Sequence, residues 1–290
     1  MSTETMRAAA FIDKGGTGKT TTTAHLGVAL SRQGYEVLLI DLAGKQGDLV
    51  KHFGEWDQVQ ERIESGDDWP NISTVFDNQW DTIAERLGEA AVNDMIIETD
   101  EGVDVIPAHP GLDSLDADLG NIDDARERYS KLDQFLTEYI DPRNYDMILI
   151  DLPGATNNVS YNGLWATQNV ITPVEMGPFE SEQTGALRSD LKKIETNFDV
   201  AIKLALVLPN KVDTRTKLAE EYLDSFTGEY PEAIAPEYIP VSQDIRNAAE
   251  RGQTVFALEE PSQTAQRACE AFLTNADALV QRLQNEVMVS

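Results

Sequence analysis

The amino-acid sequence predicts an α/β fold, with a mostly parallel, twisted sheet and helices on both of its faces. Two observations predict it. Short segments that are apolar throughout alternate with longer amphipathic stretches, a pattern typical of buried parallel strands joined by helices. A glycine-rich segment also lies between the first strand and the first helix, where such folds bind anions. The expected strands span residues 7–12, 36–41, 103–107, 146–151, 169–173 and 204–209.

The expected helices follow from spacing and end signals. In residues 20–33, Leu26, Ala29 and Leu30 share one side, and Gly34 marks the C-terminal end. Further helices are expected at residues 80–91, 123–139, 181–197, 216–226 and 261–287. Residues 54–71 are the least regular and are expected to form a surface excursion. Because the chain has no repeat and no linker rich in proline or glycine, we expect a single domain over residues 1–290.

The charge balance limits the partners. Asp and Glu number 51 against 23 Lys and Arg, a net charge of −28. Such a surface repels nucleic acid and anionic lipid, and it resembles the surfaces of proteins from salt-loving organisms. The single cysteine, Cys269, excludes an internal disulfide, and no apolar run approaches the ~18 residues of a membrane span. The N-terminus lacks a secretory signal, so we expect a cytoplasmic protein without a membrane partner.

The strongest functional signal is the segment DKGGTGKTT at positions 13–21. Its glycines allow the backbone to wrap around phosphates, while the following helix start directs free N–H groups at them. Lys19 is expected to contact the β- and γ-phosphates, and the Thr20 hydroxyl to bind Mg²⁺. The nucleotide-binding residues expected here are Lys14, Gly15, Gly16, Thr17, Gly18, Lys19, Thr20 and Thr21.

The segment departs from the standard phosphate-loop pattern G-x-x-x-x-G-K-[ST], because Asp13 occupies the first glycine position. It matches a variant with an extra lysine and resembles the deviant Walker A box of the ParA/MinD family of P-loop ATPases. Further segments are similar to those of the family at residues 34–41, 103–107, 145–154 and 239–252. The resemblance implies a P-loop NTPase fold of the deviant Walker A type, with ATP and Mg²⁺ as ligands.

The resemblance also implies how the extra lysine acts. In the family this lysine crosses a dimer interface and contacts the phosphates bound to the other subunit. Lys14 is the matching residue. A lysine donated in trans neutralises two facing nucleotides, so ATP is expected to drive a sandwich homodimer.

Two aspartates are candidate Mg²⁺ ligands. Asp41 and Asp151 each end an apolar strand, and nucleotide sites lie at the carboxyl ends of parallel strands. The histidines at positions 25, 52 and 109 lack metal-ligand spacing and are expected to be structural.

Ala43 is the most informative departure from the family pattern. The family has D-x-D after the second strand, and its second aspartate helps to position the attacking water. Here the sequence is Asp41-Leu42-Ala43, so that carboxylate is missing. We therefore expect ATP binding and dimerisation with slow hydrolysis. Ala43 is either natural or an engineered replacement that traps the ATP state; the intact flanking pattern favours the second.

The candidate base-binding residues allow two purines. Asn210-Lys211-Val212-Asp213 matches the N-K-x-D guanine motif of GTPases, which makes GTP a rival ligand. In the resembled family, an asparagine from this region contacts adenine and a late proline closes the pocket. Asn210 and Pro240 match those places, which favours ATP.

The resemblance implies a role in chromosome or plasmid partition or in cargo positioning, with a ParB-like partner protein and nucleoid association if DNA is bound. Nonspecific DNA is a candidate partner through the basic residues Lys192, Lys193, Lys203, Arg215, Lys217, Arg246 and Arg251. A MinD-like spatial regulator is the alternative. Membrane binding is disfavoured, however, because the C-terminal helix carries Glu270, Asp277 and Glu286 and is expected to pack on the core.

Three rival functions can be weighed against this interpretation. An electron-donating reductase would need an iron–sulfur cluster, which Cys269 alone cannot hold. A biosynthetic ligase or kinase would use the same phosphate loop, and a switch that binds ATP without hydrolysing it would fit the missing carboxylate.

Overall fold

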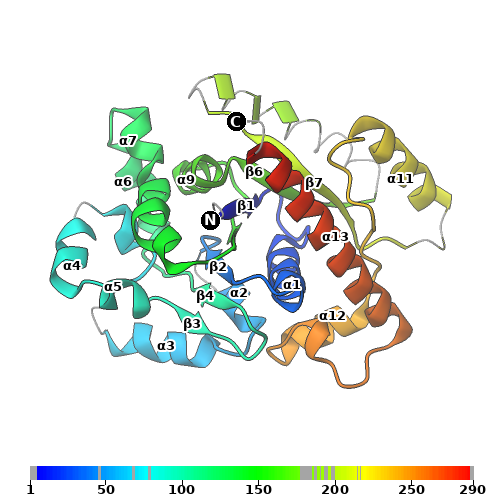
Figure 1. The fold of residues 1–290 in the computed structure, drawn as a ribbon, viewed down its shortest axis with the longest axis horizontal. Helices are drawn as coiled ribbons and strands as arrows, with labels where there is room; N and C mark the ends of the chain where they lie inside the picture. The colour runs from blue at the N-terminus through cyan, green and yellow to red at the C-terminus, as the bar shows by residue number, and fades with distance from the viewer. Residues whose placement is uncertain are drawn as a thin grey trace.

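The structure is a computed structural model, and it describes residues 5–44, 47–66, 69–77, 80–176, 185, 188, 189, 191, 192, 195, 196, 200–213, 215 and 217–287. A seven-stranded sheet forms the centre of this part of the chain (Figure 1). The strand order is β3-β4-β2-β5-β1-β6-β7, and every pairing is parallel except that of β3 with β4. The strands are β1 (Met6–Ala10), β2 (Val37–Asp41), β3 (Ile97–Glu98), β4 (Asp104–Ile106), β5 (Met147–Asp151), β6 (Asn169–Glu175) and β7 (Lys203–Asn210).

The predicted fold class is confirmed, and the six expected strands are present with small shifts at their ends. Only β3 was missed. It contributes two residues that pair with β4, Ile97 opposite Val105 and Glu98 opposite Asp104, which is too short for a periodic signal.

The helices connect these strands. They are α1 (Lys19–Arg32), α2 (Asp48–Lys51), α3 (Trp56–Ser65), α4 (Trp80–Leu87), α5 (Ala90–Asn93), α6 (Leu112–Gly120), α7 (Ala125–Tyr129), α8 (Lys131–Phe135), α9 (Asn158–Thr167), α11 (Lys217–Glu229), α12 (Gln243–Glu250) and α13 (Gln263–Val287). Short turns of other helix types are η1 (Thr74–Phe76), η2 (Leu136–Ile140), η3 (Asp141–Arg143) and η4 (Val255–Ala257). Most of the expected helix at residues 181–197 lies outside the described residues.

Three helix predictions were wrong in detail. The single helix expected at residues 80–91 is divided into α4 and α5, and Gly88 between them adopts φ +59°. The irregular excursion expected at residues 54–71 contains α3, which directs Trp56, Val59 and Ile63 into the core at helical spacing. The single helix expected at residues 123–139 is divided into α7, α8 and η2, because Ser130 adopts φ −92°, ψ 0° between the first two.

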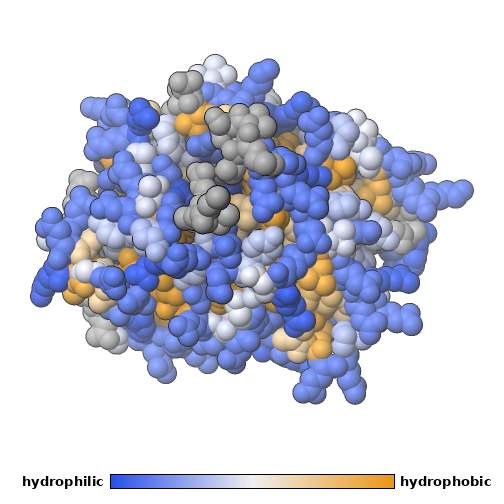
Figure 2. All heavy atoms as spheres, in the orientation of Figure 1, coloured by the Kyte–Doolittle hydropathy of each residue, from blue (hydrophilic) through white to orange (hydrophobic). Residues whose placement is uncertain are grey.

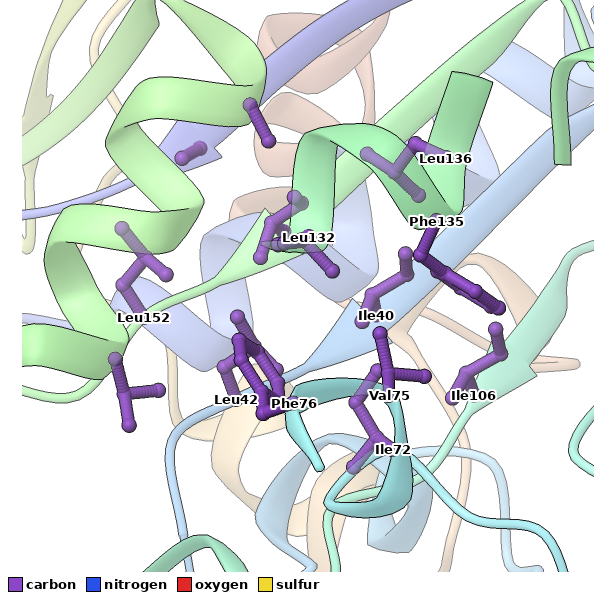
Figure 3. Close-up of a cluster of buried hydrophobic side chains, with 14 of the residues drawn as sticks. Ile40, Leu42, Ile72, Val75, Phe76, Ile106, Leu132, Phe135, Leu136 and Leu152 are labelled. Atoms are coloured by element: carbon purple, nitrogen blue, oxygen red, sulfur yellow. The ribbon is translucent and has the colours of Figure 1, made fainter. Parts of the chain in front are cut away.

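The core has two layers because successive strand residues face opposite sides of the sheet. On one side, Ile40 and Leu42 pack with Phe76, Leu132 and Phe135 under η1, α8 and α9 (Figure 3). On the other side, Leu39 and Leu149 pack against the helices α1 and α13, which lie side by side in Figure 1. The fold thereby leaves the carboxyl ends of β1, β2 and β5 at one edge of the sheet.

The C-terminal helix α13 belongs to this core, as predicted. It buries Ala268, Phe272, Ala276, Leu279 and Leu283. The face in Figure 2 is mostly hydrophilic, and only Leu87 and Val241 are large apolar residues that stand exposed in the described part of the chain. No helix there combines the length and apolar character needed to cross a bilayer.

Candidate functional site

The glycine-rich segment forms the turn from β1 into α1. Gly18 is the N-cap of α1 and has φ +95°, while Gly16 has φ +79°. A Cβ atom at Gly18 would lie 2.4 Å from the Asn210 side-chain nitrogen, so both backbone and space require glycine there. The free N–H groups of the first turn of α1 therefore open toward this loop, which is the arrangement that binds phosphate.

Lys19 lies inside the loop and is buried. Its Nζ atom donates to the carbonyl of Lys14 at 2.8 Å and to that of Ile12 at 3.3 Å. Burial lowers the pKa of Lys19, and the charges of Asp151 and Asp13 act in the opposite direction. A phosphate group bound in the loop would therefore lie next to the Lys19 ammonium group.

The two strand-end aspartates lie next to each other, as expected. Asp41 and Asp151 are register partners at the ends of β2 and β5, and both are fully buried. Burial raises the pKa of Asp41 to about 7, although its carboxylate accepts N–H bonds from Ala43 and Leu49. Burial and the neighbouring Asp41 charge raise the pKa of Asp151 well above its usual range. Two buried carboxylates this close favour a bound cation.

The donor set fits Mg²⁺. The Thr20 hydroxyl donates to Asp151 Oδ2 at 2.6 Å, and Asp151 Oδ1 is buried without a hydrogen-bond partner among the described residues. Mg²⁺ prefers one or two carboxylates, with waters and phosphate oxygens completing the shell. Among the described residues no group of three acidic, histidine or cysteine side chains could hold a metal by itself, so nucleotide oxygens would have to complete the site.

Lys14 and Ala43 lie at the same edge. Lys14 is half-buried at the start of the loop, and its backbone closely approaches Gly154, which follows β5. The neighbouring Asp13 accepts a hydrogen bond from the Thr156 hydroxyl at 3.0 Å, which links the phosphate loop to the segment after β5. Ala43 is exposed two residues beyond Asp41 and offers no side-chain acceptor.

The base-side residues reach the phosphate loop from β7. Asn210 donates to the Thr17 carbonyl at 2.8 Å. Lys211 donates to the Gly16 carbonyl at 2.5 Å and pairs with Glu175 at 2.6 Å. Pro240 lies beside this segment through a bridge with Val212. The structure therefore brings Asn210 to the phosphate loop directly and Pro240 only through its neighbour.

Sequence reasoning missed a buried histidine network behind the loop. His25 Nδ1 donates to the Thr21 carbonyl at 2.7 Å, and the Val255 N–H donates to His25 Nε2 at 3.1 Å. His52 Nδ1 donates to the Asp48 carbonyl at 2.8 Å, while its Nε2 lies 3.4 Å from the Thr21 hydroxyl. The expectation that these histidines are structural is consistent with this, but no spacing signal linked them to Thr21.

The basic candidates within the described residues do not all lie together. Lys203 begins β7, whereas Arg215 follows the carboxyl end of the same strand, so the two residues lie near opposite ends of β7. Lys203 and Lys192 line an open cavity of ≈ 1220 Å³ together with Glu195, Glu229 and Glu232. Lys217, Arg246 and Arg251 are exposed, and Lys193 lies outside the described residues.

Comparison with known proteins identifies related chains. A family model described as an AAA domain matches residues 6–204, more than half of the chain. The chromosome partitioning protein ParA of Caulobacter vibrioides is 28% identical over 258 residues, which cover 88% of each chain.

Solved structures share the fold. Cobyrinic acid a,c-diamide synthase of Mycobacterium smegmatis, with a bound ATP analogue and magnesium, has a TM-score of 0.71 and 25% identity over 97% of this chain and 96% of that one. An aspartate-to-alanine variant of Cyanothece McdA in complex with ATP has a TM-score of 0.74 and 20% identity over 96% and 97% of the two chains.

Proposed function

The chain belongs to the AAA-domain family of P-loop ATPases that includes the ParA and Soj partition proteins, and on that premise we propose that it is an ATP-dependent dimerising switch. It acts in chromosome or plasmid partition or in cargo positioning, in the cytoplasm. The observation that carries the proposal is the loop from Lys14 to Thr21 beside the buried pair Asp41 and Asp151.

ATP and Mg²⁺ bind at this edge of the sheet. The backbone of the glycine loop and Lys19 hold the phosphates, while Thr20, Asp41 and Asp151 hold the metal. Bound Mg²⁺ neutralises phosphate charge and orients the γ-phosphate. Asn210 and the Pro240 segment hold adenine.

Lys14 acts on the nucleotide of a second copy. Its side chain is only half-buried, whereas that of Lys19 is buried, which supports this role. The test is light scattering in high salt with ATP, ADP or no nucleotide. Dimers should form with ATP only, and Lys14→Ala should remain monomeric with ATP. A wild-type chain that is monomeric in all three conditions would contradict the proposal.

Hydrolysis is slow because Ala43 offers no carboxylate to the attacking water. In a single-turnover assay, Ala43→Asp should hydrolyse bound ATP about 100-fold faster than the present chain. Equal rates would contradict this part of the proposal.

DNA and a ParB-like protein are the proposed partners. The evidence is the likeness to ParA rather than charge, because the basic residues are dispersed and the chain carries −28. About four phosphate contacts would lose some 3–4 orders of magnitude in affinity for a tenfold rise in salt, so DNA binding is best measured over a salt series. The MinD-like alternative requires a membrane helix, whereas α13 buries its apolar face in the core.

A biosynthetic ligase is the second candidate, favoured by the likeness to cobyrinic acid a,c-diamide synthase. The two functions differ in what stimulates ATP hydrolysis. DNA or a partner protein should stimulate the switch, whereas a small carboxylic acid with an amine donor should stimulate the ligase.

A further inference from the structure

The segment Asn210–Asp213 is built like a guanine-binding motif in a chain that we expect to bind ATP. Its first two residues brace the phosphate loop, through Asn210 to the Thr17 carbonyl and Lys211 to the Gly16 carbonyl. Its third residue, Val212, is fixed to the Pro240 segment by hydrogen bonds to Ile239 at 2.9 Å and from Val241 at 3.2 Å. Asp213 comes next and lines a cavity together with Pro240, the residue that we propose to lie beside the base.

That carboxylate is held by an arginine two residues further along the chain. Arg215 Nε donates to Asp213 Oδ1 at 2.8 Å, and Arg215 Nη2 donates to Asp213 Oδ2 at 2.6 Å. The backbone N–H of Arg215 also donates to Oδ1, at 3.2 Å. Both oxygens therefore accept from one guanidinium fork.

Guanine would need the same two oxygens. Its N1–H and N2–H₂ groups are parallel donors that match a carboxylate, whereas adenine has an acceptor at N1 and no amino group at C2. We propose that Arg215 is a purine-specificity residue, which occupies Asp213 in place of guanine and thereby disfavours GTP. The proposal rests on the proposed ATP function. Adenine does not use Asp213, so Arg215 leaves ATP binding unaffected.

The effect should be modest and should depend on salt. The Arg215 side chain is 87% exposed, and exposed ion pairs are worth little and are screened by ions. The hydrogen bonds to Arg215 lower the pKa of Asp213 to about 2, which means that the carboxylate stays an ionised acceptor near neutral pH. We therefore expect a gain in GTP affinity of about fivefold when the arginine is removed.

The experiment measures dissociation constants of non-hydrolysable ATP and GTP analogues with Mg²⁺ by isothermal titration calorimetry. Arg215→Ala should bind the GTP analogue about fivefold more tightly than the wild-type chain, with the ATP analogue changed less than twofold. The double variant Arg215→Ala with Asp213→Ala should lose the gain. Replacing Asp213 by Asn in the Arg215→Ala background should shift the preference from the guanine to the xanthine nucleotide, because the amide donates to the xanthine oxygen.

Arg267→Ala is the matched control. Arg267 is an exposed arginine on α13 that lines the same cavity of ≈ 560 Å³ as Asp213 and Arg215. It should leave both affinities unchanged; an equal gain for GTP would mean that charge alone acts, and would overturn the proposal. Unchanged GTP affinity in Arg215→Ala would also overturn it while leaving ATP binding intact. A wild-type chain that binds neither analogue would instead contradict the proposed function.

Discussion

Asp41, Asp151 and Asp213 lie at or just after the carboxyl ends of parallel strands, yet their surroundings differ. Asp41 and Asp151 are fully buried on neighbouring strands, and burial raises the pKa of each. Asp213 follows β7 near the surface, where Arg215 lowers its pKa. Because all three aspartates lie near strand ends, burial rather than position decides whether the pKa of each is raised or lowered. The buried pair favours a multivalent cation brought with the nucleotide, whereas the exposed carboxylate is satisfied by its own chain.

The largest effect is expected from a substitution at Asp151. Replacing it with Asn removes one metal-binding oxygen and one buried negative charge. We expect Mg²⁺-dependent ATP affinity to fall about 100-fold, while the free energy of unfolding without nucleotide stays the same or rises by about 1 kcal/mol. Calorimetric titration and urea unfolding measure the two quantities.

Asp213→Asn is the matched control for that substitution. It makes the same chemical change at an exposed site and should alter ATP affinity less than threefold. If both variants lose ATP affinity equally, the distinction between the buried and the exposed aspartates is wrong.

The phosphate loop offers a second contrast, between two of its glycines. Gly18→Ala places a Cβ against Asn210 at a residue with φ +95°, and we expect the free energy of unfolding to fall by about 2 kcal/mol. Gly15→Ala meets open space without a positive φ, so its unfolding free energy should change by less than about 0.5 kcal/mol. Urea unfolding without nucleotide tests this, and equal losses would show that the Asn210 contact does not constrain the loop.

The buried His25 behind the loop makes the effect of burial measurable, because it should make the free energy of unfolding depend on pH. Burial lowers the pKa of His25 to about 3, below its ordinary value of 6.5. Below pH 6.5 the unfolded chain takes up a proton that the folded chain excludes, so stability falls with pH by up to ~1.4 kcal/mol per unit. Between pH 7.5 and 5 this amounts to about 2 kcal/mol.

The non-titrating variant His25→Gln isolates this contribution. The stability advantage of the wild-type chain over His25→Gln should shrink by that amount as the pH falls to 5. A constant difference in unfolding free energy would mean that His25 is protonated in the folded chain.

Much of the proposed phosphate-binding site was predictable from the sequence because its signals are local. The glycine loop, Lys19 and Thr20 are contiguous, and an apolar strand precedes each of Asp41 and Asp151. Parallel strands align their carboxyl ends, which explains why the two aspartates were expected to lie together. The short strand β3 and the helix α3 were missed because the first has two residues and the second lies in a segment rich in acidic residues.

The base side was harder to predict because its contacts join distant segments. Nothing in the sequence indicates that Lys211 contacts Gly16 or that Arg215 covers Asp213, since both depend on how the β7 turn is oriented. The link from His25 to Val255 spans 230 positions. Only the N-K-V-D letters marked this region, and they left the choice of purine open.

The place of β1 in the sheet has a consequence for synthesis. β1 is the first strand made, yet its neighbours are β5 and β6, which end at Asp151 and Glu175. A nascent chain that leaves the ribosome in order therefore holds a complete glycine loop long before either neighbouring strand emerges. We expect ATP capture during translation to begin only after both strands have emerged, so that nucleotide binding marks a chain that is more than half made.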